Sequence, residues 1–384
     1  MTKLELQENF RNRFHKEPTH FFFCPGRVNL IGEHIDYNGG KVMPGAISLG
    51  TYLAISKNTE KLLQFHSVNF SETAALHLQS SYSKTGKEWF NYPLGAVHQL
   101  LQHEHAISGL DMLFYGNLPI AAGLSSSASI EVLTAFAINE LFNLKISKID
   151  IALLCKKTEN EFIGINTGIM DQFAVAMGER DKAILLNCDT LEYEYLPFRT
   201  GEYILAIINS NKQRSLAGSK YNERFAECGA ALKRLKTEIN AENLCDIDLH
   251  TFQSHRHVIN DPVLEKRALH VISENFRVHE AKDALQASEL FTFGRLMYSS
   301  HQSLKELYEV SGKELDAIVD FCKGYKDCIG ARMTGAGFGG CAIALVRSAV
   351  FDDFSSALIS DYQHKIGYKP EVFASAIGDG VKCL

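Results

Sequence analysis

The chain has 384 residues, 46% of them hydrophobic, and its 45 acidic against 39 basic side chains give a net charge of −6 at pH 7. This length can bury a full core and predicts two domains. The net negative charge, without any run of like charges, argues against nucleic acid and anionic membranes as partners.

The cysteine pattern, the N-terminal segment and the apolar runs all bear on the cellular compartment of the protein. Nine cysteines, an odd number without C-x-x-C spacing, argue against both a disulfide framework and a structural zinc site. Residues 1–16 are typical of an amphipathic helix and lack the apolar core of a signal peptide. No apolar run reaches the roughly 20 residues needed to span a bilayer. We therefore expect a soluble, cytoplasmic protein.

The first half of the chain mixes strands and helices, and the second half begins with a long helical region. Helices are predicted at residues 89–103 and 128–142, and strands at residues 21–24, 46–56, 62–67, 110–116, 183–187, 203–209, 328–333, 341–346 and 371–377. Since there is no internal repeat and no long linker, only the change of pattern near residue 200 marks a domain boundary.

A dense polar cluster lies in CPGRVNLIGEHIDYNGG, residues 24–40. Its mixed donors and acceptors are Arg27, Glu33, His34, Asp36, Tyr37 and Asn38. Such a set suits a polyol such as a sugar, because each sugar hydroxyl both donates and accepts a hydrogen bond. Taken singly, His34 would more often be a structural histidine and Arg27 a salt-bridge partner. Their combination favours a binding site.

Three serines precede an apolar helix in AGLSSSASIEVLTAF, residues 122–136. The helix shows an inward stripe at Ile130, Leu133, Ala137 and Leu141. One N-cap needs only one serine, and a glycine followed by a helix N-terminus favours anions. The segment therefore predicts a phosphate-binding loop, although an ordinary capped helix in a serine-rich turn explains it equally well.

Two carboxylates stand out in KKTENEFIGINTGIMDQFAVAMG, residues 156–178. Glu159 falls on the inward stripe of a helical pattern, where a carboxylate is costly unless it is paired or bound to a cation. Glu161 falls off that stripe and is expected to be solvated. Asp171 starts a short helix, so it is either a helix-start carboxylate or a catalytic group.

A third glycine-rich segment is MTGAGFGGCAIALV, residues 333–346. Gly335, Gly337 and Gly340 match the dinucleotide-binding pattern G-x-G-x-x-G, but that fingerprint needs a helix directly after the glycines. Here a β-rich run follows. We predict a tight turn with positive φ angles that approaches another element or a ligand; a plain glycine hairpin is the alternative.

Together, these segments resemble the galactokinases of the GHMP small-molecule kinase family. GRVNLIGEHIDYNGG is similar to the galactokinase signature, GLSSSAS to the phosphate-binding motif, and TGAGFGGCAIAL to the third motif. The resemblance implies an α+β, two-lobed fold with the active site in the cleft between the lobes. Residues 1–200 would form the N-terminal lobe, rejoined by a strand within about 366–384 and near 371–377, and residues 201–365 the C-terminal lobe.

The same resemblance implies that ATP phosphorylates D-galactose at its C1 hydroxyl, giving galactose 1-phosphate and ADP. Asp171 matches the catalytic aspartate that accepts the hydroxyl proton, and Arg27 matches the arginine that stabilises the transition state. The sugar contacts map onto Glu33, His34, Ile35, Asp36 and Tyr221. The ATP contacts map onto Ser67, Ala121, Ala122, Gly123, Leu124, Ser125, Ser126 and Ser127. Ser127 and Glu159 match the ligands of Mg²⁺.

Two residues depart from the family pattern. Ile35 stands where the family usually has threonine, which weakens the case for a side-chain contact, and Ala121 replaces a common glycine. The alternatives are an N-acetylgalactosamine kinase, another GHMP kinase, or a non-catalytic galactose sensor. A sensor can dispense with the base and the metal ligands, so their retention favours an enzyme. We expect a monomer with galactose and ATP as its partners.

Overall fold

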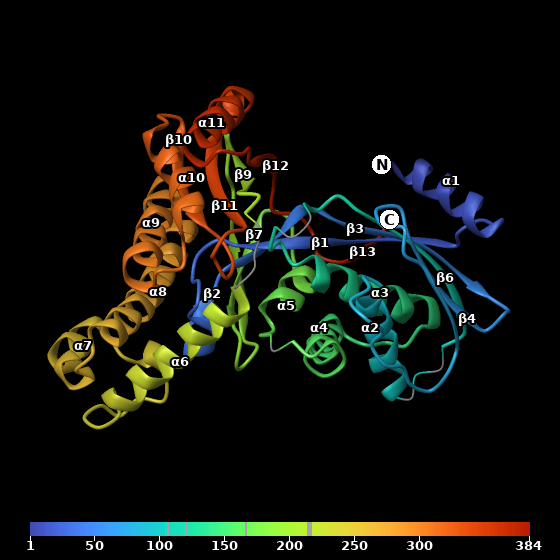
Figure 1. The fold of residues 1–384 in the computed structure, drawn as a ribbon, viewed down its shortest axis with the longest axis horizontal. Helices are drawn as coiled ribbons and strands as arrows, with labels where there is room; N and C mark the ends of the chain where they lie inside the picture. The colour runs from blue at the N-terminus through green and yellow to red at the C-terminus, as the bar shows by residue number, and fades with distance from the viewer. Residues whose placement is uncertain (104, 106, 120–121, 166, 213–216) are drawn as a thin grey trace.

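The computed structural model describes residues 1–103, 105, 107–119, 122–165, 167–212 and 217–384. Figure 1 shows two bodies side by side, each built around its own β-sheet and carrying its own helices. This mixed architecture confirms the expected α+β fold. The predicted boundary near residue 200 falls between strands that belong to different sheets, β8 (Tyr193–Pro197) and β9 (Tyr203–Asn209).

The first body contains a six-stranded sheet. In spatial order its strands are β13 (Lys382–Cys383), β1 (His20–Asn29), β3 (Pro44–Asn58), β6 (Gly109–Gly116), β4 (Leu62–Ser67) and β5 (Ala74–His77). One face carries α2 (Asn91–Gln102), α3 (Ser126–Phe142), α4 (Lys148–Lys157) and α5 (Met170–Met177), and α1 (Lys3–Phe14) lies on the other face (Figure 1).

Successive side chains of a strand point to opposite faces of a sheet. In this sheet apolar side chains occupy both faces, so each face packs against helices. The residues that meet α1 form a small separate cluster: Leu6, Phe10, Phe21, Ala54 and Leu113. Their neighbours along the strands, such as Phe22 and Phe114, belong instead to the main core beneath α3. The sheet is thereby fixed on both sides, which holds the start of α3 in a defined place.

The second body contains a four-stranded antiparallel sheet in the order β10 (Cys328–Met333), β11 (Cys341–Arg347), β9 and β12 (Glu371–Ser375). Its helices are α6 (Ala217–Leu235), α7 (Leu249–His255), α8 (Pro262–Gln286), α9 (Leu290–Ser303), α10 (Lys313–Gly324) and α11 (Phe351–Ile366). The helical region predicted after residue 209 therefore forms the flank of this second body (Figure 1).

A strand within the predicted range 366–384 does return to the N-terminal sheet, namely β13, but the strand placed near residues 371–377 belongs to the other body. β12 pairs with β9 along its whole length, from Glu371 opposite Asn209 to Ser375 opposite Leu205, because β9 still has a free edge there. The chain then bridges Ile47 of β3 through Ile377, and only the short β13 reaches β1. The final segment thus links both sheets.

A third sheet of three strands joins β2 (Lys41–Val42) to β7 (Lys182–Asn187) and β8, and Figure 1 shows β2 and β7 between the two bodies. β2 directly follows the polar cluster of residues 24–40. That cluster consequently lies where the bodies meet. Within the described ranges, no helix combines the length and apolar character that crossing a bilayer requires.

Candidate active site

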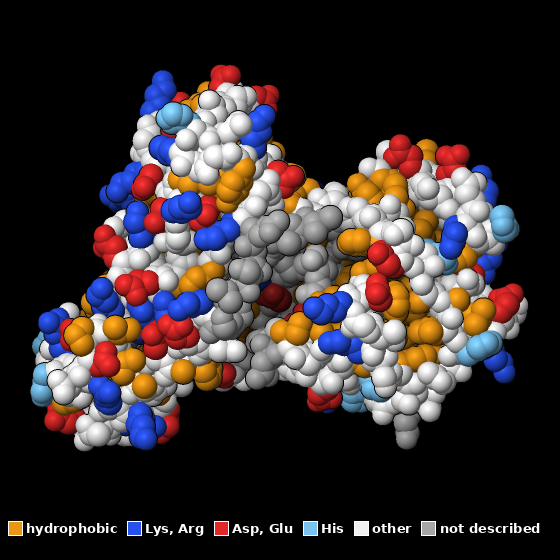
Figure 2. Space-filling model, viewed as in Figure 1, with side chains coloured by type: hydrophobic (Ala, Val, Ile, Leu, Met, Phe, Trp, Pro, Cys, Tyr) orange, Lys and Arg blue, Asp and Glu red, His pale blue; other side chains and the backbone are white. Residues whose placement is uncertain are grey.

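A pocket of about 500 Å³ lies between the two bodies, and Figure 2 shows the surface hollowed there. Residues from both bodies line it, including Arg27, Asn29, Glu33, His34, Asp36, Thr167, Met170, Asp171, Tyr221, Asn222, Gly335 and Ala336. Segments more than a hundred residues apart in the chain therefore meet at one cavity. Below we call it the interbody pocket.

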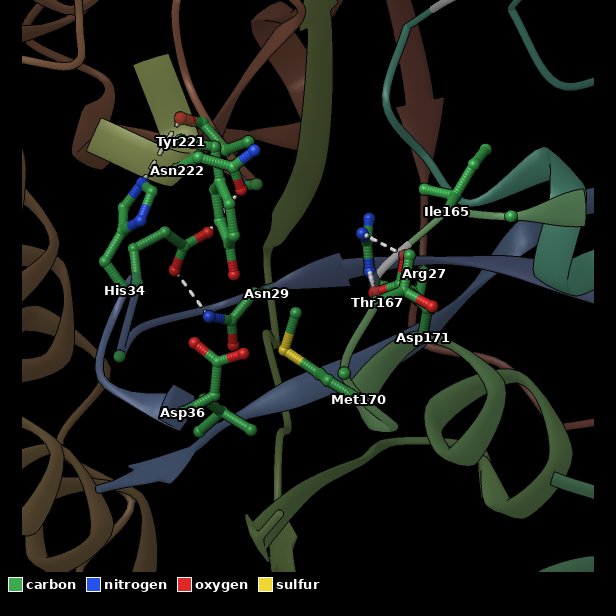
Figure 3. Close-up of a pocket in the computed structure, with 17 residues that line it drawn as sticks. Arg27, Asn29, His34, Asp36, Ile165, Thr167, Met170, Asp171, Tyr221 and Asn222 are labelled. Atoms are coloured by element: carbon green, nitrogen blue, oxygen red, sulfur yellow. Dashed lines mark hydrogen bonds and ion pairs between the residues drawn. The ribbon is translucent and has the colours of Figure 1, made fainter. Parts of the chain in front are cut away.

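Arg27 and Asp171 form a bidentate ion pair on one wall of this pocket (Figure 3). Arg27 Nε donates to Asp171 Oδ1 and its terminal nitrogen donates to Oδ2, both at 2.7 Å. The other terminal nitrogen of Arg27 donates to the carbonyl of Gly123 at 2.8 Å. Arg27 is only 6% exposed, so the geometry of Asp171 is held by a buried, rigid partner.

Ser125 adds a third hydrogen bond to this carboxylate. It occupies the N-cap position of α3 but has φ 59° and ψ 47°, and its side chain makes no capping bond. Instead, its hydroxyl donates to Asp171 Oδ2 at 2.5 Å. Ser125 therefore does not cap α3 with its side chain, which its left-handed backbone turns toward Asp171 instead.

His34 is held by hydrogen bonds at both ring nitrogens. Nε2 lies 3.2 Å from the carbonyl of Ala336 and Nδ1 lies 2.9 Å from the Tyr37 hydroxyl, which in turn lies 2.8 Å from the Tyr308 hydroxyl. Burial lowers the pKa of His34 to about 4, so the ring is neutral at pH 7. Because a carbonyl only accepts, Nε2 carries the proton and Nδ1 accepts from Tyr37.

Glu33 ties the polar cluster to the third glycine-rich segment. It is 3% exposed and accepts from Gly335 N at 2.6 Å, from Asn29 Nδ2 at 2.5 Å and from Arg332 at 2.9 Å. Burial raises the pKa of Glu33, and the Arg332 guanidinium opposes that shift. With three donors engaged, this carboxylate has little capacity left for a ligand.

Ile35 is the one described residue of the predicted sugar set that does not line the interbody pocket. It is fully buried, and its side chain packs against Gly40 in the core. A side-chain contact between Ile35 and a pocket ligand does not fit this arrangement. Glu33, His34, Asp36 and Tyr221, in contrast, all line the pocket.

The third glycine-rich segment forms the predicted turn, between β10 and β11. Gly335, Gly337, Gly339 and Gly340 all have positive φ angles. At Gly337 an added Cβ would lie 2.3 Å from the carbonyl of Val310, so a side chain does not fit. Gly335 and the adjacent Ala336 reach the interbody pocket. The predicted tight turn with positive φ angles is confirmed, and it approaches the interbody pocket.

A second pocket, of about 300 Å³, lies on the other side of the serine loop. Its walls combine hydroxyls with aromatic rings: Thr51, Ser67, Phe70, Trp89, Tyr92, Phe114, Ser126 and Ser127. Phe70 and Trp89 stack with their ring centroids 6.1 Å apart. The first N–H groups of α3 have no partner within the helix, so this wall favours an anion. We call it the aromatic pocket.

The remaining loop residues separate the two pockets. The carbonyls of Gly123 and Leu124 accept hydrogen bonds from Arg27, and Ala122 and Leu124 are buried. Ala121, also predicted to contact the nucleotide, lies outside the described residues. The loop therefore connects the Arg27–Asp171 pair on one side with the hydroxyls of Ser126 and Ser127 on the other.

Glu159 is 5% exposed, which confirms its predicted inward orientation, whereas Glu161 is exposed as expected. Glu159 lies in a π-helical turn, Thr158–Ile163, and its Oε2 accepts a hydrogen bond from the Thr167 hydroxyl at 2.7 Å. Within the described ranges, no group of three or more His, Cys, Asp or Glu side chains is placed to hold a metal ion. Any cation here needs ligands of other kinds.

Asp36 lies across the interbody pocket from Asp171 and close to Tyr221 in the view of Figure 3. Burial and the neighbouring carboxylates of Glu33 and Asp171 raise the pKa of Asp36 to about 6. An ionised carboxylate at this point accepts hydroxyl donors from a ligand, whereas its protonated form accepts fewer.

We predict that a hydroxyl-rich ligand of this pocket binds about tenfold more weakly at pH 5 than at pH 7. The ionised fraction of Asp36 falls by that factor when the pH drops one unit below a pKa of 6. His34 stays neutral over this range because its pKa is about 4. Isothermal titration calorimetry with that ligand at both pH values measures the change in its dissociation constant. In Asp36→Asn the affinity should be independent of pH, and a flat wild-type profile would contradict the prediction.

Three family models match the chain in sequence order. They are described as the galactokinase galactose-binding signature, over residues 8–57, the GHMP kinases N terminal domain, over residues 91–179, and the GHMP kinases C terminal, over residues 281–363. The first covers the whole polar cluster of residues 24–40 and all of β1, and the second covers the serine loop, Glu159 and Asp171.

Relatives match over the whole length. The chain is 47% identical to a galactokinase of Enterococcus faecalis over 382 residues, covering 99% of each chain. It superimposes on a crystal structure of Lactococcus lactis galactokinase complexed with galactose with a TM-score of 0.93, at 42% identity and 100% coverage of both chains. A mevalonate kinase of Methanococcus jannaschii, 22% identical, shares the fold with a TM-score of 0.66 over 94% of this chain and 99% of its own.

Proposed function

The chain belongs to the galactokinase family of the GHMP kinases and is an ATP-dependent sugar kinase, and from this premise we propose that it phosphorylates D-galactose at the C1 hydroxyl. One observation carries the proposal for the site. The Arg27–Asp171 pair lines the interbody pocket and is bonded, through Gly123 and Ser125, to the loop whose serines line the aromatic pocket.

The interbody pocket is the proposed sugar site. Its wall offers acceptors and donors from Asp36, Tyr221 and Asn222, as a polyol requires. Glu33 and His34 have their polar atoms engaged by the protein, so we assign them mainly to positioning the walls. The Lactococcus lactis galactokinase, 42% identical to this chain, was crystallised in complex with galactose, which supports galactose as the sugar.

The aromatic pocket is the proposed nucleotide site. Phe70 and Trp89 offer flat rings against which a base can stack, with Ser67 nearby. The phosphates would then extend along the serine loop toward the N-terminus of α3, where free N–H groups and hydroxyls receive anionic oxygens. That direction leads to Arg27 and the sugar pocket. Since ATP is supplied inside the cell, the proposal implies a cytoplasmic enzyme.

Ser127 and Glu159 are the proposed protein ligands of Mg²⁺. Both offer oxygen, which Mg²⁺ prefers, and Mg²⁺ is usually held by one or two side chains together with phosphates and water. Glu159 is buried, and within the described residues it has a hydrogen bond from Thr167 but no ion pair, so a cation fits its environment. When bound, Mg²⁺ neutralises charge on the β- and γ-phosphates.

Asp171 is the proposed residue that orients the C1 hydroxyl and accepts its proton. Its two oxygens are fixed by Arg27 and Ser125, so the carboxylate faces the sugar in one orientation. Arg27 in turn offers a guanidinium between the two pockets, where negative charge develops on the transferred group. Because phosphoryl transfer needs little covalent chemistry from the protein, positioning and charge are what these residues supply.

ADP release tests the proposal directly. With Mg²⁺ and ATP, galactose is expected to give one ADP per sugar consumed, and an ATP-only control gives a much lower rate. 2-Acetamido-2-deoxygalactose is expected to react much more slowly. A reversed preference would assign the chain to the N-acetylgalactosamine kinases, and galactose binding without ADP release would assign it to the sensors.

A further inference from the structure

Glu131 on α3 is a buried carboxylate that the roles above leave unused. It is 0% exposed, and neither of its carboxylate oxygens has a hydrogen-bond partner in the part of the chain that the structure describes. Burying a carboxylate without a partner costs free energy, so such groups are normally paired or bound to a cation. The groups around Glu131 therefore indicate which partner its carboxylate could have.

Other buried glutamates of this protein show how a carboxylate is normally accommodated. Glu33 lies 2.9 Å from the Arg332 guanidinium, and Glu274 lies 2.7 Å from that of Arg277. Although burial alone would raise it, these guanidinium groups lower the pKa of Glu274 to about 2. Among the residues that the structure describes, no Lys or Arg side chain pairs with the Glu131 carboxylate. Burial and the charge of Glu159 instead raise its pKa.

The position of Glu131 on α3 directs it toward the proposed cation site. It lies four residues after Ser127, so the two side chains share one face of the helix on successive turns. Helical side chains lean toward the N-terminus, which brings the Glu131 carboxylate toward Ser127. Ser127 itself lines the aromatic pocket.

Besides α3, the proposed cation site is bordered by α2 and by the π-helical turn that carries Glu159. Gly95 lets α2 approach that turn closely, because an added Cβ would lie 2.5 Å from the Thr158 methyl carbon. Tyr92, one turn earlier on the same face of α2, lines the aromatic pocket, and its pKa is raised by burial and by the charges of both Glu159 and Glu131. Glu131 and Glu159 thus converge beside the pocket that holds Ser127.

We propose that Glu131 is a further oxygen donor to the magnesium site, acting on the ion directly or through one bound water, together with Ser127 and Glu159. The inference rests on the proposed function and extends it by one residue. It explains why a carboxylate without a basic partner is kept in the interior of α3: the divalent cation supplies the positive charge that arginine supplies for Glu33 and Glu274.

Manganese binding to the ADP complex tests this proposal without measuring turnover. Free Mn²⁺ is titrated by electron paramagnetic resonance against wild type, Glu131→Gln and the matched control Glu140→Gln, an exposed residue of the same helix. We expect the dissociation constant of Mn²⁺ to rise at least about tenfold in Glu131→Gln and to stay unchanged in Glu140→Gln. The metal-free Glu131→Gln protein should unfold at about the same temperature, because within the described residues the carboxyl group makes no hydrogen bond that the substitution could break.

Each other outcome overturns the proposal in a distinguishable way. Equal Mn²⁺ affinity in wild type and Glu131→Gln would remove Glu131 from the cation site and leave the proposed function intact. A lower unfolding temperature of metal-free Glu131→Gln would assign Glu131 a structural role instead. If wild type with ADP binds no Mn²⁺, the proposed magnesium site itself falls, and this inference with it.

Discussion

Replacing Asp171 with asparagine is expected to lower kcat by about 10²–10⁴ while sugar and nucleotide affinities change little. The substitution removes the proton acceptor and the negative charge but keeps the shape of the side chain. An asparagine oxygen can still accept one hydrogen bond from Arg27 or Ser125, so the wall of the interbody pocket persists. The loss should therefore fall on the chemical step.

Steady-state kinetics together with calorimetric binding of galactose and ADP separates these effects. Asp283→Asn, an exposed residue of α8, is the matched control and should retain wild-type kcat. The role assigned to Asp171 is wrong if Asp171→Asn loses sugar binding while its residual turnover persists. In that case the carboxylate would serve the sugar site rather than the transfer.

Replacing Glu33 with glutamine is expected to destabilise the fold by about 3–5 kcal/mol and to weaken sugar binding. The carboxylate accepts from Asn29, Arg332 and the Gly335 backbone, whereas a glutamine has one acceptor oxygen and would turn its NH₂ group toward another donor. Arg332, 0% exposed, would then lose its nearer carboxylate partner, Glu33 at 2.9 Å, and would keep Glu274 at 4.0 Å. The turn that lines the pocket would lose its tie to the polar cluster.

Urea unfolding and galactose titration measure the two effects. The matched control is Glu17→Gln, because Glu17 and its partner Arg11 are both about half exposed and solvent screening leaves such a pair little effect on stability. Unchanged stability and sugar affinity in Glu33→Gln would mean that Glu33 does not connect the two bodies. Lower stability with unchanged sugar affinity would limit its role to the fold.

Much of the strand pattern was accessible from the sequence because apolar residues alternate or run together over short stretches. The strand over residues 62–67 and the one over 328–333 were predicted with the bounds that the structure gives. β1 was predicted too short, since Pro25 and Gly26 are typical of a strand end. The structure continues the strand through a register shift between Pro25 and Arg27, and Arg27 lines the interbody pocket directly after that shift.

Local sequence patterns do not encode which strands and side chains contact one another across the fold, so these contacts were not predicted. The pairing of β12 with β9 depends on which sheet edge is free, and the turn of Ser125 toward Asp171 depends on a left-handed residue before α3. Tyr308 reaches His34 through Tyr37 from far along the chain, and no motif marks it. Glu131 was missed because a stripe at Ile130 and Leu133 predicts one buried face, whereas the structure buries most sides of α3.

The central claim is that the sugar hydroxyl and the terminal phosphate meet at the Arg27–Asp171 pair between the two pockets. A crystal structure with galactose and a non-hydrolysable ATP analogue tests it most directly. The account predicts the C1 hydroxyl within hydrogen-bond distance of Asp171, with the triphosphate running from the aromatic pocket past Ser127 toward Arg27. A triphosphate bound away from Ser127, or a sugar remote from Asp36 and Asp171, would contradict it.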